Sequence, residues 1–366
     1  MSDSIYGKSR WQDAEALRPL ATLVVITCGL WWMLGQLAVV LRPLQVAIFL
    51  AYVLLPWFNR LRQTMPGPIA IVSLAGLAAA ILGIMAVITY SSLLGVQDEF
   101  PKIENRAVTI ARACGDYVQK HLPWLIPDAG VAEEGPEPKK NHRPEIVFAE
   151  RLTELAKVEA GRAAAVAAGG ISEAVIAGLY LFFLLLEASR FPDRVRGAYD
   201  TKQADQILAI FNRINIAVNG YLRAKVISGL WLAGVVAVVL WGFGVKFVFL
   251  WAVFTFLCNF IPYVGSVLAY SLPTAFAVLL LDGTAKPIAF AIVLLAVHIF
   301  MSTVTEPLLI GKAVGLSPLI ILVALTLWGS IWGLAGMFLA VPLTMVVLIV
   351  LDNIPSTRSF ARLLLT

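Results

Sequence analysis

Two polar side chains stand inside long apolar stretches, where an amide or an ionisable ring has chemical meaning. Asn259 lies within "FLCNFIPYVG", and His298 lies within the apolar run 287–305. A polar or ionisable group inside a membrane segment is a functional hypothesis by default, since hydrocarbon offers it no partner. For His298 two interpretations stay open. A structural hydrogen bond is favoured over proton coupling, because His298 stands alone among apolar residues.

Two charged residues follow the run that contains His298. Glu306 and Lys312 flank Pro307 and Gly311 near its end. Their opposite charges allow two interpretations, an ion pair between them or a gate on a transport path. Both residues are expected near the inner face of a membrane.

No catalytic constellation is found along the chain. The histidines are scattered, at His121, His142 and His298, and the HExxH, GxSxG, Walker and dinucleotide-binding motifs are absent. The cysteines show no ligand spacing, which argues against a disulfide framework and a zinc site. We therefore predict a protein that is not an enzyme, with no cofactor and no metal site. Without a phosphate-binding loop, this chain does not use ATP directly.

The composition is that of a membrane protein. The chain is 60% hydrophobic and only 14% charged, whereas soluble domains are roughly half apolar. Apolar runs of 18 or more residues recur, and each can cross a hydrocarbon core of about 30 Å as a helix. Continuous runs exclude membrane β-strands, which alternate. We predict an all-α polytopic protein with about eight transmembrane helices in the lipid bilayer.

Apolar runs, breaks and basic residues divide the chain into segments. The predicted segments are a cytoplasmic N-terminus (1–19), transmembrane helices 1 to 3 (20–95), an extracytoplasmic helical insert (96–162), transmembrane helix 4 (163–186), a cytoplasmic amphipathic linker helix (187–225), a transmembrane core (226–351) and a cytoplasmic C-terminus (352–366). Because proline cannot continue a helix, Arg42-Pro43 is expected to separate helices 1 and 2 as a hairpin.

Basic residues set the predicted orientation. They gather before helix 1, around Arg60 and Arg62, between Arg190 and Lys225, and at Arg358 and Arg362. The positive-inside rule then places both termini in the cytoplasm. This rule already explains the basic residues, and no nucleic-acid-binding motif accompanies them, so we expect no nucleic-acid partner.

Two apolar stretches of the core are broken in matching ways. In each, one glycine is followed 21 residues later by a second, as Gly244 and Gly265 and as Gly315 and Gly336. Paired, interrupted membrane segments point to a transport site built from an internal repeat. The alternative is a chance similarity between helices whose glycines only allow close packing.

The charge rule turns these stretches into two hairpins that enter from opposite faces, which is an inverted repeat. Non-helical backbone at membrane depth is tolerated only where protein or a water-filled cavity satisfies it. The breaks should therefore line a cavity and offer helix ends to a polar ligand. The transport-path candidates are Asn259, Pro262, Gly265, His298, Glu306, Pro307, Gly311, Gly329, Gly333, Gly336 and Pro342.

Three blocks carry a resemblance to a known family. "NFIPYVGSVLA" (259–269), "EPLLIGKAVGLSPLIIL" (306–322) and "LWGSIWGLAGMFLAVPLT" (327–344) resemble the signature blocks of the autoinducer-2 exporter family. The resemblance covers most of the chain. It implies an inner-membrane homo-oligomer, a pentamer, that exports a small polar signalling metabolite in quorum sensing, with autoinducer-2 as the favoured substrate.

Two alternatives stay open beside this interpretation. Other members of the family are associated with sodium or lithium/proton antiport, for which His298 and Glu306 would be the first residues to test. A membrane scaffold or regulatory protein, which assembles through its helices and conducts nothing, is the alternative from another class.

Overall fold

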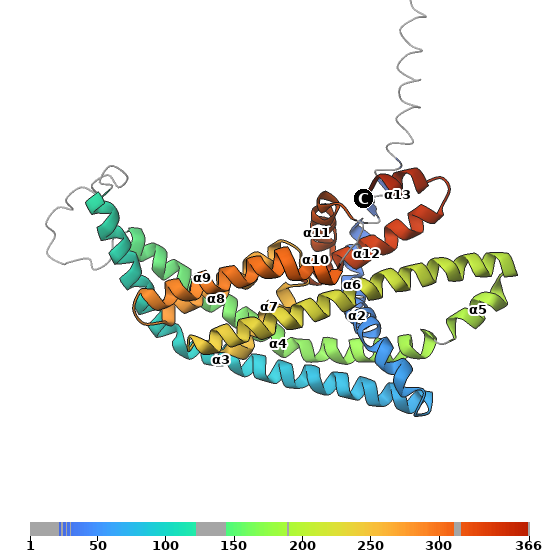
Figure 1. Ribbon diagram of the computed structural model, residues 1–366, viewed down its shortest axis with the longest axis horizontal. Helices are drawn as coiled ribbons and strands as arrows, with labels where there is room; N and C mark the ends of the chain where they lie inside the picture. The colour runs from blue at the N-terminus through green and yellow to red at the C-terminus, as the bar shows by residue number, and fades with distance from the viewer. Residues whose placement is uncertain are drawn as a thin grey trace, which may run out of the picture. The chain divides into compact units, whose positions relative to one another are not determined.

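The computed structural model describes residues 31–121, 144–188, 190–310 and 316–364, together with Thr22, Val25, Ile26, Cys28 and Gly29. Throughout these residues the elements are helices, which confirms the predicted all-α class (Figure 1). They are α2 (Ala38–Leu61), α3 (Gly67–His121), α4 (Pro144–Ala188), α5 (Phe191–Ala198), α6 (Thr201–Gly242), α7 (Val248–Cys258), α8 (Val264–Leu280), α9 (Ala285–Phe300), the π-helix η1 (Met301–Thr305), α10 (Glu306–Ile310), α11 (Pro318–Trp332), α12 (Leu334–Asn353) and α13 (Arg358–Leu364).

The helices confirm a multi-pass membrane protein. Within the described ranges, 5 helices are long and apolar enough to cross a membrane, or up to 6 if the end of α4 and α5, bent by 56°, form one span. The shorter apolar helices α7, α8 and α11 belong to the two broken stretches. Eight spans therefore remain a prediction that would count these shorter helices.

The predicted break at Arg42-Pro43 is wrong. Helix α2 runs without interruption from Ala38 to Leu61, and the turn that precedes it lies at Leu37. A proline removes one backbone hydrogen bond, but membrane helices tolerate this loss when the rest of the helix is intact.

Three other helices are longer than the predicted segments, and one of them, α4, has 45 residues and joins the predicted insert to the predicted helix 4. Helix α3 has 55 residues and continues through Pro101, so it joins the predicted helix 3 to the insert. Helix α6 has 42 residues and joins the predicted linker helix to the following span. Lys225 therefore lies in the middle of a continuous helix and not at a helix end.

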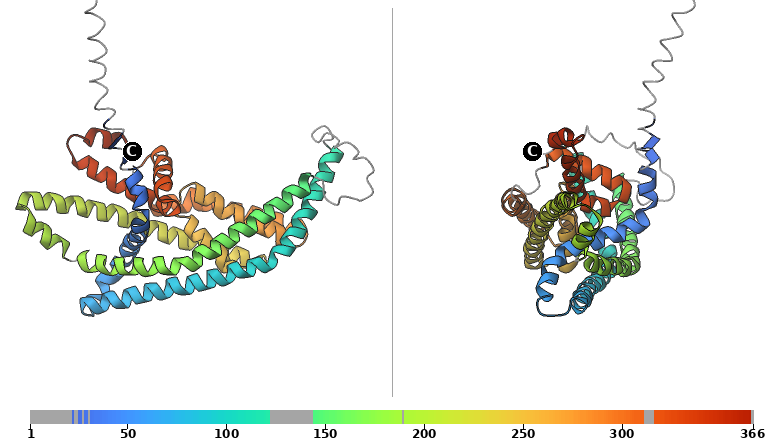
Figure 2. Two further views of the ribbon diagram at one scale, coloured as in Figure 1. Left: turned by 180° about the vertical axis from the view of Figure 1, so that it is seen from behind. Right: turned by 90° about the vertical axis from the view of Figure 1, so that its right-hand side faces the viewer.

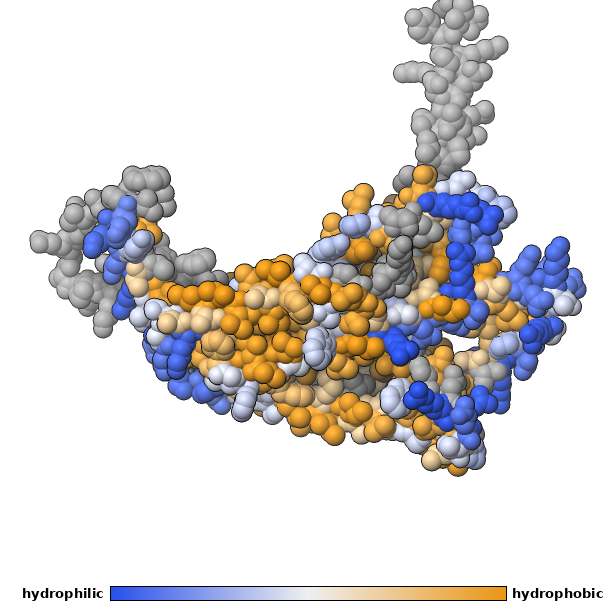
Figure 3. All heavy atoms as spheres, viewed as in Figure 1, coloured by the Kyte–Doolittle hydropathy of each residue, from blue (hydrophilic) through white to orange (hydrophobic). Residues whose placement is uncertain are grey.

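The described residues form two compact units, and the larger one contains α3, the C-terminal part of α6, and α7 to α10. Its core includes Val236, Leu240, Phe290 and Leu294, all fully buried. Figures 1 and 2 show α7, α8 and α9 beside the C-terminal half of α6. Hydrophobic residues also cover the outer face around α8 and α9 (Figure 3), as expected for a surface in contact with lipid.

The smaller unit contains most of α2, α5, the N-terminal part of α6, and α11 to α13. The α11 and α12 pair is joined by a hydrogen bond from Trp328 Nε1 to Thr344 Oγ1 at 3.1 Å. Tyr52 of α2 donates to Asn215 Oδ1 of α6 at 2.8 Å. The first bond closes the pair of consecutive helices α11 and α12, and the second joins two helices that are distant in sequence.

Candidate functional site

The first broken stretch turns through a strained backbone. Helix α7 ends at Cys258, and the amide of Val264 donates to the carbonyl of Pro262 at 2.7 Å, which closes a γ-turn at Tyr263. Tyr263 has φ 62° and ψ −62°, a conformation that costs a non-glycine residue about 1–3 kcal/mol. A Cβ at Gly265 would overlap the carbonyl of Cys258. The two arms approach so closely that only glycine fits there.

The second broken stretch also turns where a glycine lies against a backbone carbonyl. Gly333 separates α11 from α12 with φ 65° and ψ −140°, a conformation that side chains disfavour. A Cβ at Gly336 would overlap the carbonyl of Trp328, and a Cβ at Gly329 would press on Met337. Each hairpin therefore has a glycine set directly against a backbone carbonyl of its preceding helix.

A polar cluster lies at the first break, and we call its four residues, Lys225, Ser228, Asn259 and Glu306, the Lys225 cluster. Asn259 caps the end of α7, and its Nδ2 donates to the carbonyl of Lys225 at 3.3 Å and to Ser228 Oγ at 3.1 Å. Lys225 Nζ donates in return to the carbonyl of Asn259 at 3.0 Å. It also forms an ion pair with Glu306 of α10. The cluster joins three elements of the larger unit.

The charges of this cluster are largely withdrawn from the surface. The side chain of Lys225 is 4% exposed and that of Glu306 is 29% exposed. A buried ammonium is tolerated only when a counter-charge and hydrogen bonds replace its hydration. Glu306 supplies the counter-charge. The carbonyl of Asn259 at the end of α7, which carries partial negative charge, accepts a hydrogen bond.

Two buried hydroxyl groups lie near this cluster. Tyr221 precedes Lys225 by one helical turn on α6, and Thr255 precedes Asn259 by one turn on α7. Both side chains are buried, and within the described residues neither Tyr221 Oη nor Thr255 Oγ1 has a hydrogen-bond partner. An unsatisfied buried polar atom costs about 1–3 kcal/mol. Such atoms therefore mark places where a hydroxyl-bearing ligand would restore a bond.

His298 lies on the same helical segment as Glu306, separated from it by η1. Its ring is buried and lies edge-on to Tyr270, with centroids 6.2 Å apart. Its Nε2 has no hydrogen-bond partner in the part of the chain that the structure describes. The extra residue of a π-turn rotates the helix that follows, and such turns are frequent at functional sites. Here the turn sits directly before the cluster's carboxylate.

The structure brings together only some of the predicted site residues. Asn259 and Glu306 meet through Lys225, with Pro262 and Gly265 in the same break. Pro307 belongs to α10, whereas Gly311 and Lys312 lie outside the described residues. The remaining predicted residues belong to the smaller unit and to its hairpin; they are Gly329, Gly333, Gly336 and Pro342.

Four site residues were missed by sequence reasoning: Lys225, Ser228, Tyr221 and Thr255. The charge rule explained Lys225 as a cation at the membrane surface, but the structure buries it. A signal was present: Tyr221 and Lys225 are four residues apart, on one face of a helix. Val218 and Leu222 lie on the same face, and apolar residues at this spacing indicate a buried helix face.

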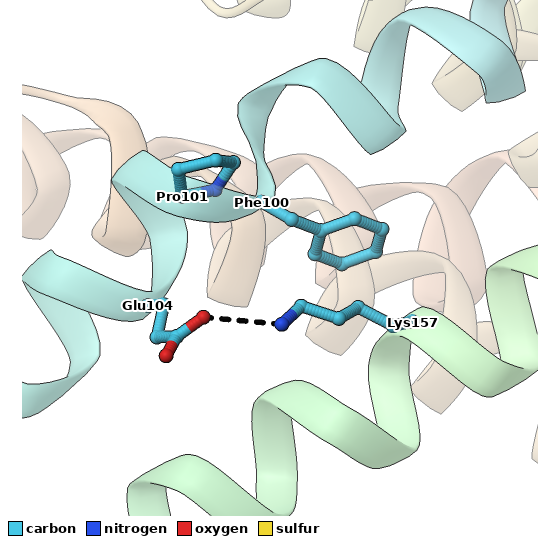
Figure 4. A pocket seen from close by; sticks show the side chains of 4 residues that line it. All are labelled: Phe100, Pro101, Glu104 and Lys157. Carbon is cyan, nitrogen blue, oxygen red and sulfur yellow. Dashed lines mark hydrogen bonds and ion pairs between the residues drawn. The ribbon is translucent and has the colours of Figure 1, made fainter.

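A pocket of about 390 Å³ lies elsewhere in the larger unit (Figure 4). Phe100 and Pro101 of α3 form one wall, and an ion pair between Glu104 and Lys157, 3.1 Å long, joins α3 to α4. The hydrogen bonds that Lys157 donates to the carboxylates of Glu154 and Glu104 raise the pKa of its ammonium, and the bond to Glu154 has the larger effect. Because this ion pair is solvated, it stabilises the contact between α3 and α4 only weakly. Within the described residues, none of the four side chains that line this pocket has a buried polar atom without a hydrogen-bond partner, in contrast to Tyr221 and Thr255 beside the Lys225 cluster.

Comparison with known proteins points to transport. The model of the AI-2E family transporter matches residues 20–356. The chain is 28% identical over 354 residues to YhhT of Escherichia coli, whose name assigns it to transport; 95% of this chain and 93% of YhhT are covered. It is 26% identical over 358 residues to the AI-2 transport protein TqsA of Escherichia coli, with 94% of each chain covered. It is also 26% identical over 162 residues to a sodium-lithium/proton antiporter of Halobacillus andaensis, covering 43% of this chain and 45% of that protein.

Proposed function

Because the chain belongs to the AI-2E family of transporters, we propose that it carries a small, uncharged polar metabolite across the bilayer through the Lys225 cluster. Autoinducer-2 is the leading substrate, since TqsA, similar over 94% of this chain, is named for it. The resemblance also supports a homo-oligomer, a pentamer, in the bacterial inner membrane with both termini in the cytoplasm. Transport is downhill or ion-coupled.

The observation that carries this proposal is the Lys225 cluster together with two neighbouring hydroxyls, of Tyr221 and Thr255, that have no hydrogen-bond partner among the described residues. A hydroxyl-rich solute offers both donors and acceptors, so it would pair with Tyr221 Oη, Thr255 Oγ1 and the amide of Asn259. An uncharged solute leaves the ion pair between Lys225 and Glu306 intact. A site that bonds hydroxyl groups rejects analogues that lack them, because its own buried groups are then left unpaired.

In this proposal the two broken hairpins are the elements that change conformation during transport. Each has a strained or glycine-only turn, and the matched glycines Gly265 and Gly336 support an internal repeat. Backbone strain at a ligand site favours a two-state element. An inverted repeat would then let one hairpin open while the other closes.

Sodium or lithium/proton antiport is the second candidate. The similarity to the antiporter of Halobacillus andaensis supports it, and Glu306 and His298 are titratable. However, the carboxylate of Glu306 already holds the ammonium of Lys225. A bound sodium ion would have to displace that ammonium, and for this reason we rank antiport below metabolite transport.

Flux in proteoliposomes tests these candidates together. The purified protein should move labelled autoinducer-2 along its gradient, and substitution of Thr255 by Val should reduce this flux while protein stability is kept. A matched control is Thr109→Val, because Thr109 is exposed and bonds only its own helix, at 2.8 Å. Sodium-driven proton movement without solute flux would favour antiport. A folded, oligomeric protein that moves neither would favour the scaffold alternative.

A further inference from the structure

Three arginines surround one carboxylate at the end of α12. Arg213 of α6 donates to Asp352 Oδ2 at 3.0 Å. Arg358 and Arg362 of α13 approach Asp352 Oδ1 through their Nε atoms, at 3.9 and 3.5 Å. All four residues belong to the smaller unit. We call these arginines the α13 arginine site.

The site carries more positive charge than Asp352 can neutralise. Asp352 is 9% exposed, whereas the side chains of Arg358 and Arg362 are 57% and 66% exposed. Because Nε is the atom nearest the carboxylate, the terminal NH₂ groups of both arginines are farther from Asp352 than Nε is. Among the described residues they donate no hydrogen bond that would occupy them. Guanidinium groups in this state match the oxygens of a phosphate.

Helix α13 packs against the end of α12 and has a basic face and an apolar face. The hydroxyl of Thr357 donates to the carbonyl of Leu351 at 2.8 Å, and Ala361 is fully buried, so α13 is held against the end of α12. Arg358 and Arg362 share one face by their spacing of four. Phe360 is 59% exposed and Leu363 is 83% exposed.

The neighbouring span places this platform at a membrane boundary. The span formed by α12 ends at Asn353, and α13 begins at Arg358. Figure 3 shows hydrophilic and hydrophobic residues next to one another around α13. A short helix with a basic face and an exposed apolar face is typical of the membrane interface.

We propose that Arg213, Arg358 and Arg362 bind the phosphate of an anionic phospholipid, while Phe360 and Leu363 enter its acyl region. The positive-inside rule accounts for basic residues near this end of α12. It does not account for three of them gathered on one carboxylate beside exposed aromatic and aliphatic side chains. A free phosphate ion would use the arginines alone, whereas a lipid uses both faces. This site is independent of the transported solute.

The test is lipid binding to the full-length protein in detergent, measured by native mass spectrometry. Phosphatidylglycerol is compared with phosphatidylcholine of the same acyl chains, in the wild type and in Arg358→Gln/Arg362→Gln. Arg213 is retained, so Asp352 keeps its hydrogen bond. We expect wild type to prefer phosphatidylglycerol, and affinity for it to fall roughly fivefold for each arginine removed.

Matched variants separate this site from general basic charge and from a soluble ion. Arg60→Gln/Arg62→Gln removes the same charge from arginines that lie over Trp57 and Phe58, and it should keep wild-type binding. Phe360→Ser/Leu363→Ser should weaken phosphatidylglycerol binding, and inorganic phosphate should not displace the lipid. Equal binding of both lipids, or equal loss in the control pair, would overturn the proposal. So would displacement by phosphate with no effect of the apolar variant. Thermal unfolding in detergent confirms that each variant is folded.

Discussion

Lys225 and Asn259 hydrogen-bond each other twice. Lys225 Nζ donates to the carbonyl of Asn259 at 3.0 Å, and Asn259 Nδ2 donates to the carbonyl of Lys225 at 3.3 Å. Each residue thus satisfies a backbone group of the other, on two helices 34 positions apart in sequence. This exchange fastens the end of α7 to α6 and places the carbonyl at that helix end on the buried ammonium.

Removing the ammonium tests whether the ion pair is structural or part of the transport path. Lys225→Met leaves the carboxylate of Glu306 without its partner, so we expect a loss of about 3–5 kcal/mol in the free energy of unfolding. Adding Glu306→Gln should recover most of that loss, because the uncompensated charge is gone. Thermal unfolding in detergent measures both variants. If the double variant regains stability and also full flux, the ion pair has no role in transport.

The amide of Asn259 should matter more for flux than for folding. Asn259→Ala removes two hydrogen bonds at the break, and we expect a loss of about 1–3 kcal/mol in stability and a strong loss of solute flux. Asn353→Ala is a matched control, because Asn353 Nδ2 bonds only Ile349 of its own helix, at 2.7 Å. Equal flux in the two variants, measured in proteoliposomes, would contradict the site assignment.

The hairpin glycines should respond differently from a glycine in open space. Gly265→Ala and Gly336→Ala place a methyl group against a backbone carbonyl, so each should destabilise the protein by about 1–3 kcal/mol. Gly234→Ala in α6 meets nothing within 4 Å, and it should be neutral or stabilise the protein by about 0.5–1 kcal/mol. Unfolding of the three variants in one detergent decides this. Similar behaviour of all three would mean that the turns relax readily.

The hairpin glycines were easier to predict from the sequence than the burial of Lys225, for a physical reason. Gly265 and Gly333 report a local requirement, a close approach or a left-handed backbone, that only glycine meets. The burial of Lys225 depends on the ends of α7 and α10, which are distant in sequence. In the sequence, the positive-inside rule already explained Lys225 as a cation at the membrane surface beside an apolar run. Likewise Pro43 signalled a break that the surrounding helix overrides.

Acid should weaken a contact outside the membrane spans. Lys246 and Lys102 bond Glu99, at 2.6 and 3.2 Å, and lower the pKa of its carboxyl. A lowered pKa in the folded state means that the contribution is full above the usual glutamate range, near 4.3, and is lost as the pH falls through the lower folded value. The midpoint of thermal unfolding should therefore fall with acid less steeply in Glu99→Gln than in wild type. Glu154→Gln, at an exposed ion pair, is the control; identical profiles in wild type and Glu99→Gln would contradict this.

His298 separates metabolite transport from proton-coupled antiport. Its Nε2 has no hydrogen-bond partner among the described residues. The structure therefore shows no hydrogen bond of Nε2 that would be needed for folding. An uncharged solute requires no proton to be taken up or released, so we expect His298→Gln to leave the pH dependence of solute flux unchanged. If protons are exchanged for a cation through this ring, the same substitution must shift or abolish the pH profile. Flux in proteoliposomes with imposed pH gradients measures this directly, and a shifted profile would place His298 on a proton path that leads through the π-turn to Glu306.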